Sequence, residues 1–364
     1  MSFLVVLALV LTASSYDQLE IYKFSQDISE PIQSNSPCIW QISKSYVTVD
    51  IQSGKSPSMA LALEQGCNDG YEITLIDAEH IETITISKTV PVQISGKNTT
   101  SGKRMIIGGG SENSGEGEYI IRIDSASTGD IIVQNIKMRE WNGGLIRCDG
   151  GKSVTLRENV LIGGGSIVHN TDGILDISNC EFIGDGLNVP IDSFITVMKG
   201  SINIINSYFS KGQFKGKSDG CIVCCETSTS CTIESCEFTE NKYDIGASAV
   251  SITTKTCQML TIKGTSNKRT IFYGLDSNNT FNGHFIKTVS SKISISYSDF
   301  TDAIFTNNGK AITIDEYQAF QIRSAITVQS QSSDNSGIRY LRFSECIFAN
   351  NKGNIQYGAV TVDI

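Results

Sequence analysis

The chain of 364 residues has a formal net charge of −9, and 40% of its residues are hydrophobic, which is enough to form a core and excludes a disordered chain. It contains no basic run that would attract a phosphate backbone, so we expect no nucleic-acid partner. The 33 glycines against 5 prolines favour a β-rich fold with many tight turns.

Residues 1–15 have the order of a secretory signal peptide, with an apolar run from Phe3 to Leu11 followed by small residues. The run is shorter than the ~20 residues that span a bilayer, so an uncleaved anchor is the weaker alternative. No later segment of the sequence is long and apolar enough to cross a membrane. We therefore expect an extracellular or cell-surface protein, with a lead-in segment over residues 16–56.

A short helix is predicted next. Ser56 is its expected cap, Pro57 its first helical residue, and Gly66 its stop. Such a helix would cover the first coil of a solenoid. Strands are expected to follow at Tyr71 to Ile76, Thr83 to Ile86 and Val92 to Ile94.

A repeat then dominates the chain. Seven segments share the pattern apolar-x-apolar-x-x-x-x-apolar, and they end at Met138, Leu161, Phe182, Phe209, Phe238, Phe300 and Phe348. The first five ends are 21 to 29 residues apart, which fits one solenoid coil each. The 62-residue interval predicts two coils, with Leu260 to Ile262 as the missing strand, and the 48-residue interval predicts either two coils or one long insertion.

Each segment predicts a strand with one buried face, followed by a bend. Asn179 suits left-handed backbone geometry, so Cys180 and Phe182 after it would point inward again. Glycine-led apolar stretches between the segments supply further strands. The fold class is therefore all-β, a right-handed parallel β-helix over residues 57–364 with a short N-terminal capping helix, and its handedness follows from the crossover rule.

An antiparallel β-sandwich is the alternative fold, and it predicts Asn-Gly hairpin turns. The two candidates, at Asn142 and Asn282, each precede a glycine-led strand of the repeat instead. At the other end, Ala359 to Ile364 alternates like one more strand. We expect that the natural chain continues there, that a partner makes end-to-end contact with this coil, or that its edge is exposed.

The chain resembles the right-handed parallel β-helix proteins of the pectin-lyase-like group over residues 57–364. Within that group it is similar to the repeats of polymorphic outer-membrane proteins. Their F-x-x-N motif stands at Phe238–Asn241, Phe305–Asn308 and Phe348–Asn351, and their G-G-A-[ILV] motif is matched loosely at Gly143–Ile146 and Gly164–Ile167. The resemblance implies surface exposure and adhesion, through binding of an extracellular protein or glycan.

An enzymatic alternative rests on His169-Asn170-Thr171-Asp172-Gly173, since the related polygalacturonases carry an N-T-D motif with a catalytic Asp. Inverting hydrolysis needs a second carboxylate about 6.5–9.5 Å away. The candidate Asp185 lies 13 residues further on, less than one coil, which would place it on another face. Asp172 and Asp185 are therefore a weak catalytic pair for a polysaccharide lyase or glycoside hydrolase, and a non-enzymatic binding protein is the first hypothesis.

The sequence contains 11 cysteines, and an oxidising compartment would pair some of them. A zinc site is disfavoured because the C-x-x-C at residues 221–224 has no second copy, so we expect no metal and no cofactor. Asn98 and Asn278 stand in glycosylation triplets. The three histidines, at positions 80, 169 and 284, are interpreted as surface or turn residues. The disulfide candidates are Cys221, Cys224, Cys225, Cys231 and Cys236, of which Cys231 and Cys236 also fit inward positions of the repeat.

Overall fold

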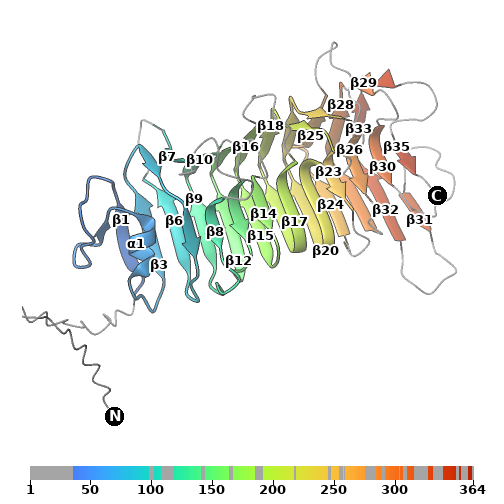
Figure 1. Ribbon diagram of the computed structural model, residues 1–364. Coiled ribbons are helices and arrows are strands. Elements are labelled where there is room, and N and C mark those ends of the chain that lie inside the picture. Colours follow the sequence, from blue (N-terminus) through green and yellow to red (C-terminus); the bar gives the residue numbers. More distant parts are fainter. Residues whose placement is uncertain are drawn as a thin grey trace, which may run out of the picture. The chain divides into compact units, whose positions relative to one another are not determined.

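Two long parallel sheets form the described part of the chain (Figure 1). The computed structural model describes residues 36–97, 102–107, 119–140, 144–163, 167–184, 192–216, 219–244, 247–253, 257, 259–274, 284–288, 292–302, 304–305, 310–314, 327–330, 339–349, 352–353 and 360–362. These residues all belong to one unit, which spans residues 33–364.

The large sheet contains 21 strands. They are β1 (Cys38–Ile42), β2 (Lys55–Ser56), β3 (Tyr71–Leu75), β5 (Ile84–Ile86), β6 (Val92–Gly96), β8 (Tyr119–Ile123), β9 (Ile131–Gln134), β11 (Gly144–Cys148), β12 (Ser153–Arg157), β14 (Val168–Asn170), β15 (Ile174–Ser178), β17 (Ser193–Ile205), β20 (Gly220–Glu234), β23 (Ser248–Ile252), β24 (Met259–Lys263), β26 (His284–Thr288), β27 (Lys292–Ser296), β30 (Lys310–Ile314), β31 (Thr327–Ser330), β32 (Arg339–Ser344) and β35 (Val360–Val362).

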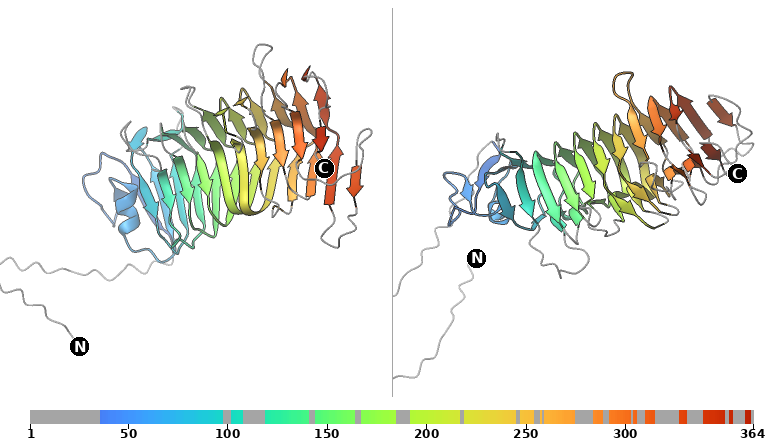
Figure 2. Two further views of the ribbon diagram at one scale, coloured as in Figure 1. Left: turned by 45° about the vertical axis from the view of Figure 1, so that its right-hand side comes forward. Right: turned by 90° about the horizontal axis from the view of Figure 1, so that it is seen from above.

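The small sheet contains 10 strands, and two further pairs stand apart from it. Its strands are β4 (Glu79–Ile81), β7 (Arg104–Ile107), β10 (Ile136–Glu140), β13 (Val160–Gly163), β16 (Glu181–Gly184), β18 (Tyr208–Ser210), β21 (Glu237–Thr239), β25 (Thr270–Tyr273), β28 (Ser298–Thr301) and β33 (Ile347–Ala349). The separate pairs are β19 (Gln213–Phe214) with β22 (Lys242–Tyr243), and β29 (Ile304–Phe305) with β34 (Lys352–Gly353). Figure 2 shows the two long sheets from two further directions.

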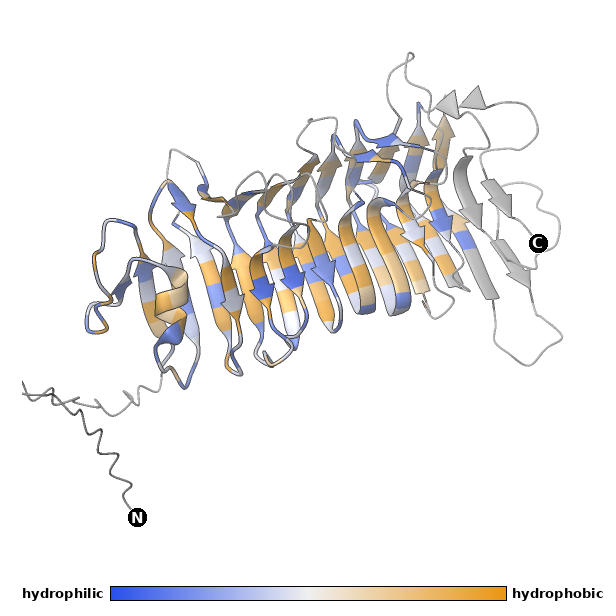
Figure 3. Cartoon of the chain, viewed as in Figure 1, coloured by the Kyte–Doolittle hydropathy of each residue, from blue (hydrophilic) through white to orange (hydrophobic). Residues whose placement is uncertain are grey.

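Equivalent positions of successive coils lie directly beside one another, as the repeat predicts. Ile177 pairs with Ile204, and Ile204 pairs with Ile233, all in parallel register. Their side chains are at most 1% exposed. Figure 3 shows the outcome as hydrophobic bands that cross the strands of the large sheet. The predicted fold class, an all-β parallel solenoid with a short helix near its N-terminal end, is confirmed.

Each coil turns from the large sheet into the small sheet at a residue with left-handed backbone. Asn179 has φ 53°, so the predicted bend is confirmed, and Asn206 one coil further on also has φ 53°. The next side chain turns inward and donates to carbonyl groups at the corner. The Cys180 thiol lies 3.4 Å from the Ser178 carbonyl oxygen, and the Ser207 hydroxyl lies 3.0 Å from that of Ile205. The asparagine or serine and the cysteine of the repeat are thus corner residues.

The third apolar position of the repeat forms a column of rings inside the coil. Successive rings lie 4.7–4.8 Å apart and nearly parallel, in the order Phe182, Phe209, Phe238, Phe272, Phe300 and Phe348. Phe272 belongs to the extra coil that the 62-residue interval predicts, and Leu260 and Ile262 pair in register on both sides. Since β27 pairs with β32 and β28 with β33, the 48-residue interval is one coil with a long insertion.

The N-terminal end differs from the prediction in two ways. The large sheet begins at β1, before the predicted boundary at residue 57, because Cys38–Ile42 pairs in parallel with Tyr71–Leu75. The helix α1 (Met59–Glu64) has Ser58 as its cap, and the Ser58 hydroxyl accepts the Leu61 N–H at 3.2 Å. Ser56 cannot cap the helix because it forms β2 beside Ile42, which leaves Pro57 outside the helix.

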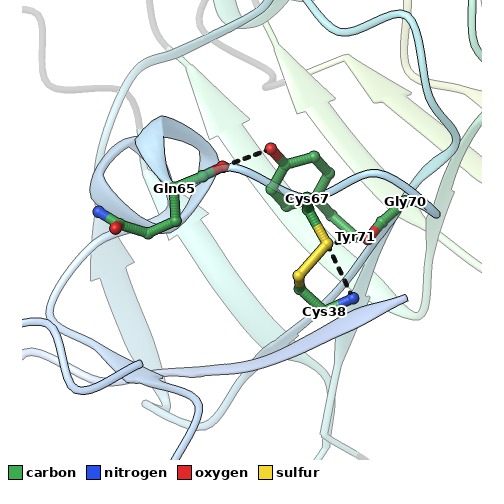
Figure 4. The surroundings of a disulfide bond; sticks show 5 residues. All are labelled: Cys38, Gln65, Cys67, Gly70 and Tyr71. Atoms are coloured by element: carbon green, nitrogen blue, oxygen red, sulfur yellow. Dashed lines mark hydrogen bonds between the residues drawn. A yellow bond between two sulfur atoms is a disulfide. The ribbon is translucent and has the colours of Figure 1, made fainter. Parts of the chain in front are cut away.

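A disulfide joins Cys38, at the start of β1, to Cys67, just after the helix (Figure 4). The Cys38 N–H points to the Cys67 sulfur at 3.1 Å, and the Tyr71 hydroxyl donates to the Gln65 carbonyl at 2.5 Å. The helix is therefore tied to the first two coils through a covalent bond and a buried aromatic ring.

Candidate functional site

A row of polar side chains crosses the outer face of the large sheet, on four neighbouring strands of its N-terminal half. Arg122, Arg147, His169 and Thr196 are paired in register on β8, β11, β14 and β17. Each follows two consecutive buried residues, such as Leu145 and Ile146 on β11, whose N–H groups both lie about 3 Å from the Ile167 carbonyl oxygen. This local bulge restores the outward direction of the next side chain.

The two arginines share one carboxylate. Both carboxylate oxygens of Asp149, just after β11, lie 2.8 Å from the Arg147 Nε, and one lies 3.3 Å from an Arg122 Nη. The Asp149 side chain is only 13% exposed, whereas those of Arg122 and Arg147 are 55% and 36% exposed. Hydrogen bonding to Asp149 raises the pKa of Arg147 above its usual value, so this guanidinium stays charged and fixed in orientation.

An aromatic ring and an imidazole complete the group. The Arg147 guanidinium lies over the Tyr119 ring at 5.8 Å, and burial raises the pKa of Tyr119. Burial, helped by the charge of Arg147, lowers the pKa of His169, which favours the neutral imidazole at pH 7. We call Tyr119, Arg122, Arg147, Asp149 and His169 the outer-face cluster.

Two carboxyl groups lie near this cluster, one residue ahead of β17 and β20. Asp192 is exposed, and Asp219 is partly buried. Burial raises the pKa of Asp219 above its usual value, opposed by the hydrogen bond from the Gly216 N–H and assisted by the charge of Asp192. The charge of Asp192 also acts on Tyr119. A carboxyl group with a raised pKa beside a carboxylate is the arrangement that acid–base chemistry uses.

Of the catalytic pair suggested by the sequence, the structure describes Asp172 alone. Asp172 lies exposed in the turn between β14 and β15, where its carboxylate accepts the Gly173 N–H at 2.7 Å. This contact accounts for Asp172 as a turn residue. Asp185 lies outside the described residues, as do the glycosylation candidates Asn98 and Asn278.

The predicted disulfide candidates are free thiols in the structure, so that prediction is corrected. Among the described residues the one disulfide is Cys38–Cys67. Burial is the main reason that the pKa of the Cys236 thiol is raised to about 12. The core positions anticipated for Cys231 and Cys236 are confirmed, with both residues 0% exposed. The candidates found free are Cys221, Cys224, Cys225, Cys231 and Cys236.

His80 is a second correction, because it is buried instead of lying at the surface. Its Nδ1 lies 3.3 Å from an Asp77 carboxylate oxygen, and its Nε2 lies 2.8 Å from one of Glu82. The Glu82 carboxylate also accepts the first two N–H groups of α1, from Met59 and Ala60, each at 2.9 Å. His80 therefore belongs to the attachment of the helix.

Sequence reasoning missed the outer-face cluster, although a signal was present. Arg122 and Arg147 each stand two positions before an Asp, and His169 stands two positions before a Thr-Asp pair, but such short patterns are common. What these three residues share is the same outward position in successive coils, and this can be recognised only once the register of the strands is known. Among the described residues, no three His, Cys, Asp or Glu side chains are arranged so that they could hold a metal ion, and no helix is long and apolar enough to span a membrane.

No protein family model, curated protein or solved structure matches the chain. The fold defines the class of protein to which the chain belongs, a parallel β-helix. The function must be inferred from the residues of the outer face.

Proposed function

We propose that the protein is a secreted or surface-displayed, non-enzymatic β-helix that binds an acidic glycan along the outer face of β8, β11, β14 and β17. The observation that carries the proposal is the alignment of Arg122 and Arg147 with His169 on neighbouring strands. Adhesion through such a face also agrees with the resemblance to pectin-lyase-like and polymorphic outer-membrane protein repeats.

The chemistry of the cluster suits a sugar that carries carboxylates. A guanidinium recognises a carboxylate with two parallel hydrogen bonds, and Asp149 holds Arg147 in a single orientation. The Tyr119 ring offers a flat apolar surface beside it. Neighbouring strands repeat at about 4.8 Å, so an extended polymer lying across them meets one side chain per coil.

The overall negative charge of the protein means that an acidic glycan would be held only by the positive charges of this site. With a net charge of −9, the protein as a whole repels polyanions, so binding must come from local contacts. We expect the affinity to fall with rising salt, since the two arginine side chains are partly exposed.

The test compares Arg147→Ala with Arg157→Ala in glycan-array and solution binding. Arg157 is an exposed arginine on β12, also in the large sheet but outside the cluster, so it is a matched control. Arg147→Ala should weaken binding to uronic-acid glycans at least about ten-fold, the lower range for a charged hydrogen bond, while Arg157→Ala leaves binding unchanged. Equal binding of neutral and acidic glycans, or equal effects of the two variants, would contradict the proposal.

A polysaccharide lyase or glycoside hydrolase is the second candidate, and the raised pKa of Asp219 beside Asp192 favours it. The experiment is incubation with acidic polysaccharides, followed by assay of new chain ends. An enzyme that uses this pair loses its activity in Asp219→Asn and keeps it in Asp172→Asn. The reverse result would point to the turn residue Asp172. If the natural protein cleaves none of these polysaccharides, the enzymatic candidate is rejected and binding remains the proposed function.

A further inference from the structure

The imidazole of His169 is the group in the outward row of Arg122, Arg147, His169 and Thr196 whose charge changes between about pH 5 and about pH 8. His169 on β14 pairs in register with Arg147 on one side and with Thr196 on the other. Neighbouring strands lie about 4.8 Å apart, so a protonated imidazole extends the line of positive charges from β8 and β11 by one coil. His169 is partly exposed, so a ligand on this face can reach it.

The charges that act on His169 come from both sides of β14. Arg147 and Asp149 lie on the β11 side, the facing residue of β17 is the uncharged Thr196, and Glu226 belongs to β20 beyond it. Burial, and then the Arg147 guanidinium, lowers the pKa of His169 below its usual 6.5, and the charges of Asp149 and Glu226 oppose this effect. In the free protein the imidazole is therefore neutral at pH 7 and gains a proton in the acidic range.

A bound carboxylate changes this balance. An anion that contacts Arg147 offsets the charge of the guanidinium, and it accepts a hydrogen bond from a protonated imidazole one coil further on. A uronic acid keeps its negative charge above about pH 5, because carboxyl groups of this kind have pKa values of about 3.5. The glycan is therefore still an anion at the pH where His169 gains its proton.

We propose that protonation of His169 tightens the binding of the acidic glycan, so that the site holds its ligand best at mildly acidic pH. This regulation rests on the proposed function, because it acts on the same site. Arg122 and Arg147 supply two permanent charges, and the imidazolium adds a third in the same row. Proton and glycan then assist each other, since binding lowers the acid dissociation constant of His169 by the same factor by which protonation raises the affinity.

Asp219 is a second source of pH dependence near the site. Burial raises the pKa of its carboxyl group above the usual value. Acidification therefore also removes a negative charge that repels the glycan. The variant Asp219→Asn abolishes this titration and leaves that of His169 in place, so the two contributions can be separated.

The experiment measures the affinity of the full chain at about pH 8 and about pH 5, at one ionic strength. The probes are oligoalginate and hyaluronan fragments, which both contain uronic acids, and neutral dextran is the blank. The affinity should rise about three- to ten-fold toward acidic pH, the range for a partly exposed charged contact. His169→Gln should bind equally at both pH values. His169→Arg, which is always charged, should bind at the higher pH as tightly as the natural protein does at the lower one.

His284→Gln and Asp219→Asn are the controls, and both should keep the rise in affinity. His284 is a partly exposed histidine on β26, four strands from β14 in the same sheet. Circular dichroism at both pH values shows that each variant is folded.

NMR titration of the imidazole signals gives a second measurement, because the acid dissociation constant of His169 should fall on binding by the same factor as the affinity rises. Binding that requires Arg147 but has one strength at both pH values overturns the regulation and leaves the proposed function standing. The same holds if the rise persists in His169→Gln or disappears in Asp219→Asn. If neither probe binds at either pH, the proposed function fails together with its regulation.

Discussion

At the scale of the residue, the column of phenylalanine rings shows why one side chain recurs in the repeat. Each inner ring lies between two others at 4.7–4.8 Å, and each coil adds one ring to the column. Offset or stacked aromatic pairs add about 0.5–1.5 kcal/mol beyond the apolar area they bury. A ring that is missing from the column therefore affects two neighbours.

We predict that Phe238→Ala lowers the free energy of unfolding by about 3–5 kcal/mol, the usual cost of removing a buried phenylalanine. Phe238 lies between Phe209 and Phe272, so the cavity opens inside the column. Denaturant unfolding followed by circular dichroism measures the loss. Tyr273→Ala is the control, since Tyr273 is 39% exposed on the outer face, and an equal loss in both variants would contradict the role of the column.

His80 gives the structure a pH dependence. Its imidazolium donates from both nitrogens, to Asp77 and to Glu82, whereas a neutral ring has only one N–H to donate. The hydrogen bond to Glu82, opposed by burial and assisted by Asp77, raises the pKa of His80 above its usual 6.5. The stabilisation is therefore complete below pH 6.5 and is lost as the pH rises through the higher folded-state value.

We predict that thermal stability falls as the pH rises above 6.5, and that His80→Gln removes this slope. His169→Gln is the matched control. Burial lowers the pKa of His169, so its contribution to the pH dependence has the opposite sign and its loss leaves the falling slope in place. Unfolding temperatures measured in one buffer series test both variants. If the fall in stability with rising pH persists in His80→Gln, other titratable groups cause it and the prediction is wrong.

At the scale of the element, the disulfide and the helix secure the first coil. The bond spans 29 residues and joins β1 to the chain just after α1, so it restricts the unfolded state and holds the solenoid end together. A parallel sheet that ends without cover exposes apolar rows, and α1 covers part of this end with Met59 and Leu63.

Reduction of Cys38–Cys67 should lower the free energy of unfolding by about 2–4 kcal/mol, from the entropy of the closed loop. The double variant Cys38→Ser/Cys67→Ser should show the same loss without reductant. Adding reductant to that variant should change nothing further, because the other described cysteines are free. A further drop would reveal another disulfide and contradict the assignment of free thiols.

The buried cysteines should resist alkylation in the folded protein. Burial raises the pKa of Cys148 and Cys236 to about 12, so few thiolates form at pH 8. Burial also raises the pKa of Cys225, to about 11, and that of Cys346, but both residues are partly exposed, so among the free cysteines these two should react first. Peptide mapping after alkylation locates the labels. Rapid labelling of Cys236 in the folded state would contradict its position in the core.

At the scale of the whole described solenoid, successive coils are structurally equivalent, so one coil can take the place of another. Phe182 and Phe209 occupy the same position one coil apart, so removing residues 183–209 would place Phe182 against Phe238. Every strand after the deletion keeps its inward face. Contacts between neighbouring coils determine the stability of such a solenoid.

We predict that the deletion of residues 183–209 leaves a folded β-sheet protein of lower stability. Deleting residues 183–195 instead removes only part of a coil, so later apolar rows lose their partners and the protein should not fold cooperatively. Circular dichroism and the sharpness of the unfolding transition distinguish the two deletions. Equal behaviour of both would contradict the equivalence of the coils.

The sequence by itself determined the repeating part of this protein. Ile177, Asn179 and Phe182 revealed a strand, a left-handed bend and an inward ring, because alternation and backbone preference act over a few residues. The same pattern predicted the extra coil at Leu260. It could not choose between one coil and two after Phe300, since an insertion leaves no mark on the repeat itself.

Only the tertiary structure decided which distant residues become neighbours. Ser56 pairs with Ile42 and so cannot cap the helix, and Cys67 reaches Cys38 instead of the later cysteines pairing among themselves. Arg122 and Arg147 gather around Asp149 because their strands lie in register. Local sequence fixes which way a side chain points within its strand, but the contacts between coils depend on register across the sheet.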